Sequence, residues 1–265
     1  MDDSRPLLSP GDPAPFTEIP AARQTALVLV CDHAGRAVPR ALGDMGVPPA
    51  EWERHIAWDI GALEVSRHLA ARFGCALVAS VYSRLVLDCN RRPDDPGLCP
   101  EVSDGTPVPA NMGLSAAERA RRLAALHVPY HDAIRRTLAA VRAKGQVPVV
   151  VSMHSCTPVF KGHERPWHIG VLWKSDPRLP KPLMERLARA PGIEVGDNQP
   201  YDARDGHGFT MREHCERAGF PHALIEVRQD LIDTRAGCER WAAIFGDALA
   251  PLVDRPELAR VEVHP

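Results

Sequence analysis

The stretch VPVVVSMHSCTP, residues 147–158, decides the fold, because an apolar run of valines leads up to His154 and ends at Pro158. An apolar run without polar alternation is typical of a strand that is buried on both faces of a sheet. A histidine at the end of such a strand could be a hydrogen-bonded core residue, a loop residue without chemistry, or a ligand at the edge of a cleft. This stretch alone does not distinguish these roles.

Four further apolar runs have the character of strands, and helical segments lie between them. The segment 59–74 has apolar residues at helical spacing and ends at a glycine. Strands that are buried on both faces and joined by helices indicate a mostly parallel sheet covered on each side. We therefore expect an α/β fold, a three-layer α/β/α sandwich around a mostly parallel mixed sheet, with strands at residues 26–31, 76–82, 147–153, 168–173 and 222–227.

Capping patterns predict where several helices begin. Ser115 opens the pattern S-x-x-E, and Pro129 should break or kink the helix that follows. Thr210 opens the same pattern before a segment that ends at Gly219. We expect helices at residues 115–144, 210–219 and 236–250.

Composition limits the class of protein. With 265 residues, of which 45% are hydrophobic and 25% charged, the chain can bury one sizeable core. We expect a single domain over residues 1–265, with residues 1–24 as an extended N-terminal arm. The 32 basic and 34 acidic residues give a net charge of -2 without a basic stripe, which argues against a nucleic acid partner.

The sequence also bears on the cellular compartment. It has no run of roughly 18 apolar residues that could span a membrane, and its acidic, proline-rich start differs from a secretory signal. The seven cysteines are odd in number, scattered and never in a CxxC pair, which suits reduced thiols. We expect a soluble cytoplasmic protein without a membrane partner; the sequence does not reveal its oligomeric state.

Polar side chains stand at the ends of the predicted strands. The first strand is followed by Asp32 and His33, so two strands deliver an imidazole to the carboxyl edge of the sheet, where sites form in such folds. Asp59 opens the following helix, and Glu226 lies inside an apolar strand, where a buried carboxylate needs a partner. Their alternative roles are charge compensation at a helix end for Asp59 and a salt bridge to Arg228 or another arginine for Glu226.

Two histidines, one aspartate and a nearby glutamate suit a mononuclear hydrolytic zinc site. Three nitrogen and oxygen ligands leave a fourth position for water, and the metal lowers the pKa of that water from about 15.7 to about 7. We expect His33, Asp59 and His154 as metal ligands and Glu226 as the general base. Imidazole ligands favour zinc over magnesium, and iron, cobalt and nickel are the other candidates.

The segment YSRLVLDCNRR, residues 82–92, offers groups for an anionic substrate. Arg84 and Arg91 could bind a carboxylate through paired hydrogen bonds, and Asn90 could donate to a carbonyl or its developing oxyanion. Each of the three could equally be an exposed side chain at the surface that binds no ligand. Asp88 is expected to pair with an arginine rather than to bind a metal.

Two stretches predict loops over this cleft. Residues 91–113 contain five prolines and three glycines, and they form either a lid or specificity loop or a passive surface excursion. The stretch around His207 resembles a second loop, with His207 as a candidate substrate contact. The other histidines are expected to be structural or solvent-facing: His55, His127, His131, His168 and His214.

Eight sequence blocks, taken together, resemble the N-formylglutamate amidohydrolase family over about residues 26–250: CDHAG, HIAWDIGA, YSRLVLDCNR, EVSDGTPVP, VSMHS, PWHIGVL, GDNQPY and LIEVRQD. The resemblance implies a phosphorylase/hydrolase-like fold, related to zinc carboxypeptidases and cell-wall amidases. It also implies one catalytic domain that hydrolyses the N-formyl or small N-acyl amide of a small anionic substrate such as N-formyl-L-glutamate.

The resemblance assigns roles by position. His33 and His154 match the metal histidines of the family, and Glu226 matches its catalytic carboxylate. The implied reaction is attack of zinc-activated water on the formyl carbon, after which Glu226 protonates the leaving nitrogen. Residues carried over as substrate-binding are Arg84, Asn90, Arg91 and Arg228.

The third metal ligand remains open. Zinc carboxypeptidases have a glutamate three residues after the first histidine, and this sequence has Arg36 there. Cell-wall amidases take an acidic residue from the start of the following helix, which is where Asp59 falls. Asp32 is the alternative, either as a ligand or as a group that orients an imidazole.

Two rival classes remain. Cys31 and Cys156 lie near the two histidines in sequence, so a cysteine-nucleophile amidase is conceivable, and it would be sensitive to thiol alkylation and indifferent to chelators. A non-catalytic protein of the same fold would bind N-acyl amino acids and turn none over.

Overall fold

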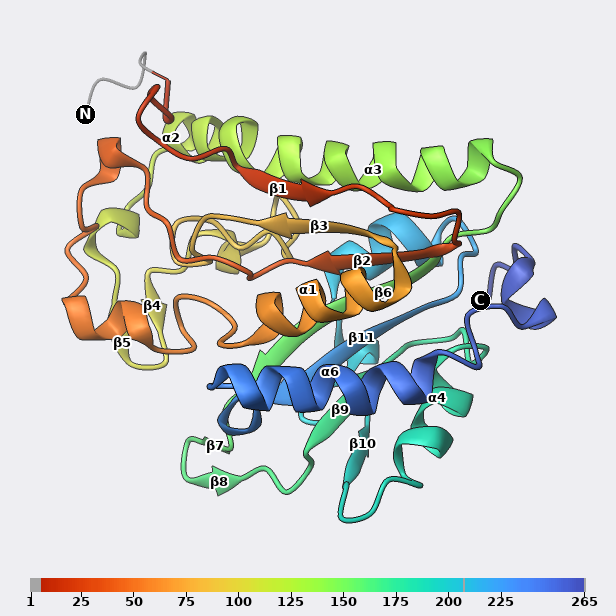
Figure 1. Cartoon of the computed structure of the whole chain (residues 1–265). Coiled ribbons are helices and arrows are strands. Elements are labelled where there is room, and N and C mark those ends of the chain that lie inside the picture. Colours follow the sequence, from red (N-terminus) through yellow and green to blue (C-terminus); the bar gives the residue numbers. More distant parts are fainter. Residues whose placement is uncertain (1–5, 207, 265) are drawn as a thin grey trace.

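A seven-stranded sheet forms the centre of the computed structural model, which describes residues 6–206 and 208–264 (Figure 1). The strands follow the order β1-β3-β2-β6-β11-β9-β10 across the sheet. All five predicted strands are present, and the two short edge strands β1 and β10 join them. Their bounds are β1 (Phe16–Ile19), β2 (Leu27–Cys31), β3 (Ala76–Ser80), β6 (Val149–Cys156), β9 (Ile169–Leu172), β10 (Val195–Asp197) and β11 (His222–Arg228).

The sheet is mixed and mostly parallel, as predicted. Strands β2, β3, β6 and β11 run parallel to one another. Strand β9 runs antiparallel to β11, β10 runs parallel to β9, and β1 is antiparallel to β3. Every residue of β2 and β6 is buried, as the uninterrupted apolar runs indicated. The carboxyl ends of β2, β6 and β11 therefore meet at one edge of the sheet.

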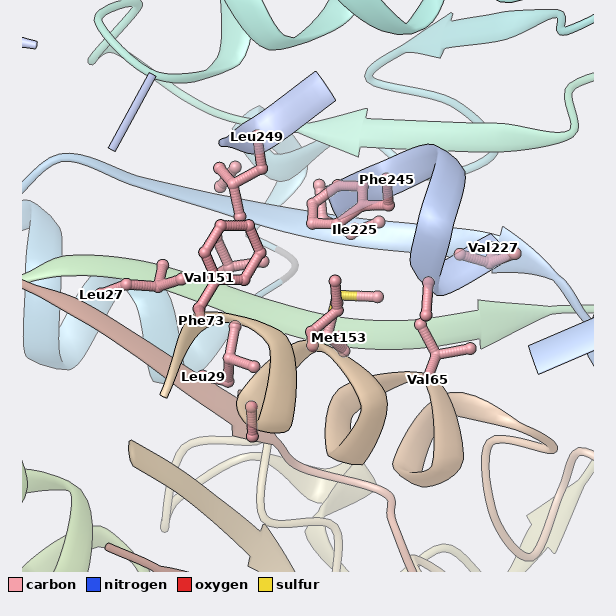
Figure 2. Packing of buried hydrophobic residues seen from close by; sticks show 14 of the residues in the cluster. Leu27, Leu29, Val65, Phe73, Val151, Met153, Ile225, Val227, Phe245 and Leu249 are labelled. Carbon is pink, nitrogen blue, oxygen red and sulfur yellow. The ribbon is translucent and has the colours of Figure 1, made fainter. Parts of the chain in front are cut away.

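Helices cover both faces of the sheet (Figure 1). Alternate residues of β2 belong to different layers: Leu29 packs under α1 and α6, and Val28 packs on the opposite face. Figure 2 shows Phe73 of α1 and Phe245 of α6 among the side chains over the first face. The three-layer α/β/α prediction is confirmed, with α1 (Ala62–Phe73), α4 (Pro180–Leu187) and α6 (Arg235–Leu249) on one face and α2 (Ala116–Arg122) and α3 (Val128–Ala143) on the other.

The helical stretch after Ser115 begins as predicted, because the Ser115 hydroxyl accepts a hydrogen bond from the Glu118 backbone N–H at 3.0 Å. The chain stays helical past Pro129, but its α-helical hydrogen bonding is interrupted just before that residue. A π-helical segment, Leu123–His127, connects α2 to α3, and Pro129 lies in the first turn of α3, where its missing N–H costs little.

The capping prediction for Thr210 is wrong. Gly208 is the N-cap residue of the short helix α5 (Phe209–Met211), and the Thr210 side chain is fully buried. Its hydroxyl donates to Asp32 Oδ1 at 2.6 Å. The buried Asp32 carboxylate needs hydrogen-bond donors, and the Thr210 hydroxyl is one of them. The start of α5 does not need this hydroxyl, because Gly208 is its N-cap residue.

The proline-rich loop is anchored in the core. It contains the hairpin of β4 (Val102–Ser103) and β5 (Thr106–Pro107), followed by a 3-10 turn that ends at Asn111. The buried Asn111 amide donates to the carbonyls of Leu85 and Pro100, at 2.8 Å each. Its oxygen accepts from Arg122 Nη1 at 2.6 Å. The loop is therefore a packed part of the domain.

Two sequence-based expectations concern the whole chain. All seven cysteines are free thiols, and all seven are buried. Of the helices in residues 6–206 and 208–264, none combines the length and hydropathy that a bilayer crossing requires.

We expect Arg122→Met to destabilise the protein by about 3–5 kcal/mol, the range for breaking a buried ion pair. The substitution leaves the Glu118 carboxylate, which lies 3.0 Å from Arg122 Nε, without this partner and removes a donor from Asn111. Urea unfolding would measure the change. Arg135→Met is the control, because Arg135 is exposed and should change stability by no more than about 0.5 kcal/mol. Equal midpoints for the two variants would contradict the prediction.

Candidate metal centre

Four segments far apart in sequence meet at the carboxyl edge of the sheet. His33 follows β2, and His154 lies near the end of β6, next to β2. Glu226 of β11 is paired in register with His154. Asp59 comes from the turn before α1, and its backbone N–H donates to the carbonyl of His33 at 2.9 Å.

The side chains of His33, Asp59 and His154 converge. Ligand atoms of these three residues all lie within 4.8 Å of one another, and all three side chains are buried. Asp59 Oδ2 lies 3.3 Å from His33 Nδ1 and 2.8 Å from His154 Nδ1. Within residues 6–206 and 208–264, this is the one group of three or more such residues with the geometry to hold a metal ion.

A carboxylate lies behind each imidazole. His33 Nε2 is 2.6 Å from Asp88 Oδ1, and His154 Nε2 is 3.0 Å from Asp32 Oδ2. Histidines that bind metals usually have such a partner on the other ring nitrogen, because it fixes the ring orientation and raises the basicity of the ligand. Asp88 also pairs with Arg84 at 2.9 Å, as the sequence predicted for it.

The two candidates for a third ligand occupy different places. Asp59 lies between the Nδ1 atoms of the two imidazoles. Asp32 lies on the far side of His154, where it accepts hydrogen bonds from Tyr130 at 2.9 Å and Ser152 at 3.0 Å. With the Thr210 hydroxyl as a further donor, Asp32 is surrounded by partners and suits an orienting role.

Buried charges of opposite sign stabilise one another here. Burial alone would raise the pKa of Asp59, but His33 and His154 hold it well below its usual range. Burial alone would lower the pKa of His154, but the hydrogen bonds that its ring donates to the carboxylates of Asp32 and Asp59 raise it well above its usual value. The carboxylates therefore favour positive charge at this point, either as protons on the imidazoles or as a bound cation, which would release protons on binding.

Glu226 lines a cavity of about 80 Å³ next to this cluster. Burial raises its pKa to about 7, and its Oε2 atom is buried without a hydrogen-bond partner among the described residues. The alternative of a salt bridge to Arg228 is not observed, because Arg228 Nε lies 2.8 Å from Asp230 instead. Glu226 is therefore a carboxyl group that can take up and release a proton near neutral pH.

The structure separates the predicted substrate residues into two groups. Arg84 and Asn90 line the cavity. Arg91 and Arg228 are not among its lining residues; Arg91 lies 3.6 Å from Asp95 at the surface.

Several predicted histidines can now be placed. His55, expected to be structural or solvent-facing, lines the cavity instead. Its position four residues before Asp59 is the one sequence signal that could have revealed this. His168 is structural, since its Nδ1 accepts from the Glu194 backbone N–H at 3.0 Å and its ring stacks on Trp241. His207 lies outside the described residues.

Buried histidines hold the chain on either side of Asn90. His131 Nε2 lies 2.9 Å from the carbonyl oxygen of Cys89, and His127 Nε2 lies 3.1 Å from the carbonyl two residues further on. Because a carbonyl only accepts, both Nε2 atoms carry a proton. His131 Nδ1 then accepts from His214 Nε2 at 2.8 Å. In this arrangement the His131 ring is neutral, which agrees with the lowering of its pKa to about 3 by burial.

The cysteines near the cluster do not suit nucleophilic catalysis. Cys156 lines the cavity, but burial raises the pKa of its thiol far above neutrality. The pKa of Cys31, which is fully buried, is raised for the same reason. A thiol that stays protonated is a weak nucleophile, so these surroundings disfavour the cysteine mechanism.

Comparison with known proteins identifies similar sequences. The family model for N-formylglutamate amidohydrolase matches residues 25–233. A protein of Pseudomonas aeruginosa named N-formylglutamate deformylase is 36% identical over 248 residues, which cover 88% of this chain and 86% of the relative. A protein of the same name from Pseudomonas putida is 29% identical over 218 residues, covering 77% of this chain and 80% of the relative.

Solved structures with the same fold are also known. A gene product of Agrobacterium tumefaciens is similar with a TM-score of 0.88 and 35% identity, over 92% of this chain and 98% of that one. An N-formylglutamate amidohydrolase from Ralstonia eutropha has a TM-score of 0.63 and 21% identity, over 91% of this chain and 98% of that one, which shows a shared fold.

We expect Asp59→Asn to weaken Zn²⁺ binding more than Asp32→Asn does. Asp32 contacts one imidazole from behind, so its loss should lower the affinity by about 10- to 100-fold, the range for groups that orient a ligand. Asp59 stands between both imidazoles, and its loss removes a candidate ligand. Competition with a chromogenic chelator would measure both affinities. A larger loss in Asp32→Asn would make Asp32 the ligand.

Acid should destabilise the protein partly through His131. Burial, followed by the neighbouring His127 and His214, lowers the pKa of His131 from 6.5 to about 3. Below pH 6.5 the His131 imidazole binds a proton in the unfolded chain but stays neutral in the folded chain. The free energy of unfolding therefore falls as the pH is lowered from 6.5 to about 3. Urea midpoints of the wild type and His131→Gln at pH 7.5 and 5 would measure this. The variant should lose less stability over that interval, and an equal loss would refute the assignment.

Proposed function

The chain belongs to the N-formylglutamate amidohydrolase family, and we propose that it hydrolyses the N-formyl amide of an acidic amino acid such as N-formyl-L-glutamate. The products would be formate and the free amino acid. The observation that carries this proposal is the convergence of His33, Asp59 and His154 beside Glu226, in one cavity at the end of the parallel strands. Cleavage of an amide C–N bond is the reaction class of the family.

We propose that His33 Nδ1, His154 Nδ1 and Asp59 hold a zinc ion. Two nitrogens and one oxygen match the three-ligand set of hydrolytic zinc sites, and the carboxylates behind the imidazoles supply the usual outer partners. When bound, zinc would lower the pKa of a water molecule and polarise the substrate carbonyl. Iron, cobalt and nickel would suit the same donors.

Glu226 acts as the general base and then as the general acid. It accepts a proton from the attacking water as the new C–O bond forms on the formyl carbon, and it gives that proton to the nitrogen as the C–N bond breaks. A pKa of about 7, raised by burial, suits both steps near neutral pH. The unpartnered Oε2 atom supports this role, since no group in the described residues is hydrogen-bonded to it.

Donors on the cavity wall stabilise the developing oxyanion. Asn90 and Arg84 both line the cavity, and Arg84 is held in place by Asp88. The small volume of about 80 Å³ favours a formyl group over a bulky acyl group. Arg91 and Arg228 remain predictions as outer substrate contacts.

The test is formate release from N-formyl-L-glutamate by the zinc-loaded protein, followed with a coupled formate dehydrogenase. Removal of the metal by a chelator should abolish turnover, and Zn²⁺ should restore it. Glu226→Gln should keep its zinc and lose about 10²- to 10⁴-fold in kcat, because the amide cannot accept the proton. Glu239→Gln is a matched control, since Glu239 is exposed on α6 and should have no effect.

Each rival class predicts a different result. Full turnover in Glu226→Gln would remove this residue from the mechanism. Inactivation by iodoacetamide together with indifference to chelators would favour the cysteine nucleophile. Binding of N-formyl-L-glutamate without formate release would favour the non-catalytic protein.

A further inference from the structure

Arg165 is a buried cation beside the cavity. The residue is 8% exposed. Its Nη1 atom donates to the Thr157 hydroxyl at 3.1 Å and lies 3.4 Å from the carbonyl oxygen of the same residue. Throughout residues 6–206 and 208–264, no Asp or Glu oxygen lies within the 4.0 Å ion-pair distance of its guanidinium.

Two aromatic rings hold the Arg165 side chain in place. Its Cζ atom lies 4.9 Å from the ring centroid of Phe160 and 4.9 Å from that of Tyr201. The ring faces of Phe160 and Tyr201 and the Thr157 hydroxyl offset part of the free-energy cost of burying the guanidinium. They are neutral groups, so they do not neutralise its charge. A fixed, buried cation of this kind suits the binding of an anion.

The arginines that the sequence suggested for this role are already paired. Arg84 Nη2 lies 2.9 Å from Asp88, and Arg228 Nε lies 2.8 Å from Asp230. A substrate carboxylate would have to compete with these partners. Arg165 needs no such exchange, because among the described residues no carboxylate lies within ion-pair distance of its guanidinium.

The position of Arg165 relative to the cavity also fits. Thr157 and Tyr201, which both contact Arg165, line the cavity together with Glu226. Arg165 follows the hairpin of β7 (Val159–Phe160) and β8 (His163–Glu164), at the edge of the sheet where β6 ends (Figure 1). A cavity of about 80 Å³ has room for the reacting amide, so the rest of an acyl amino acid must extend past its wall.

We propose that Arg165 binds a carboxylate of the substrate and so determines the preference for an acidic amino acid. The inference rests on the proposed function and adds to it the residue that recognises the anion. Phe160 and Tyr201 hold the guanidinium before the substrate arrives, so little side-chain entropy is lost on binding. The guanidinium N–H groups of Arg165 that Thr157 and Tyr201 leave unused donate charge-assisted hydrogen bonds to that carboxylate.

Kinetics of Arg165→Met test this role. We expect KM for N-formyl-L-glutamate to rise by about 30-fold or more, as for loss of one partner of a buried charge pair, with kcat within about threefold. Arg165→Lys should lie between, because an ammonium keeps the charge and loses the fork. Arg204→Met is the control: Arg204 is exposed, pairs with Asp202, and should leave KM unchanged.

The identity of the bound carboxylate follows from two amide substrates, N-formyl-L-glutamine and the α-amide of N-formyl-L-glutamate. In the wild type, KM should be higher for an amide substrate than for N-formyl-L-glutamate wherever the amide replaces a carboxylate that the protein recognises. In Arg165→Met, KM should no longer rise for the amide that replaces the carboxylate bound by Arg165. Circular dichroism and zinc content would verify that the variants fold and keep the metal.

Glutarate binding separates this proposal from the proposed function. The dicarboxylate should raise the thermal midpoint of the zinc-loaded wild type and leave that of Arg165→Met unchanged. If the wild type releases no formate but shows this shift, the proposed function fails and the Arg165 site stands. A folded Arg165→Met protein that keeps the wild-type KM overturns the proposal, as does a wild type that glutarate does not stabilise.

Discussion

Charge balance between two buried imidazoles and three buried carboxylates is the constraint on which the rest of the site depends. Asp32, Asp59 and Asp88 are each buried, and each contacts His33 or His154. Carboxylates at this depth are stable only beside positive charge or hydrogen-bond donors. Protons on the imidazoles meet this need, and so does a divalent cation between them. The same balance that stabilises the fold therefore prepares the site for a metal ion.

The parts of the chain that surround the cluster are held by buried polar contacts of their own. His131 and its partner His214 fix the backbone near Asn90, and Arg122 fixes the proline-rich loop through Asn111. Such supports keep donors in position for chemistry that tolerates little displacement. Recognition is a separate matter, because proteins that share a catalytic site can differ in the substrate they accept. In this chain, the surroundings of Arg165 are where such a difference would arise.

Much of the fold and part of the site could be predicted from the sequence. The apolar runs, including residues 147–153, revealed buried strands because burial on both faces removes polar alternation. Parallel strands end at a common edge, so His33 and His154 could be expected to lie close together once both were recognised at strand ends. The Ser115 cap followed from a local pattern, since its partner is three residues away. These features depend on neighbours in sequence or on one general rule of sheet topology.

Only the tertiary structure decided the rest. It placed Asp59 between the imidazoles and Asp32 behind one of them, and it directed the Thr210 hydroxyl to Asp32 instead of the helix backbone. It also buried Arg165 without a carboxylate partner among the described residues, whereas Arg228 is paired with Asp230. The sequence by itself determined the strands, the layers and the imidazoles at the strand ends, because hydrophobic periodicity is a local signal. The pairing of each charged group depends on which distant side chains share a cavity, and folding alone decides that.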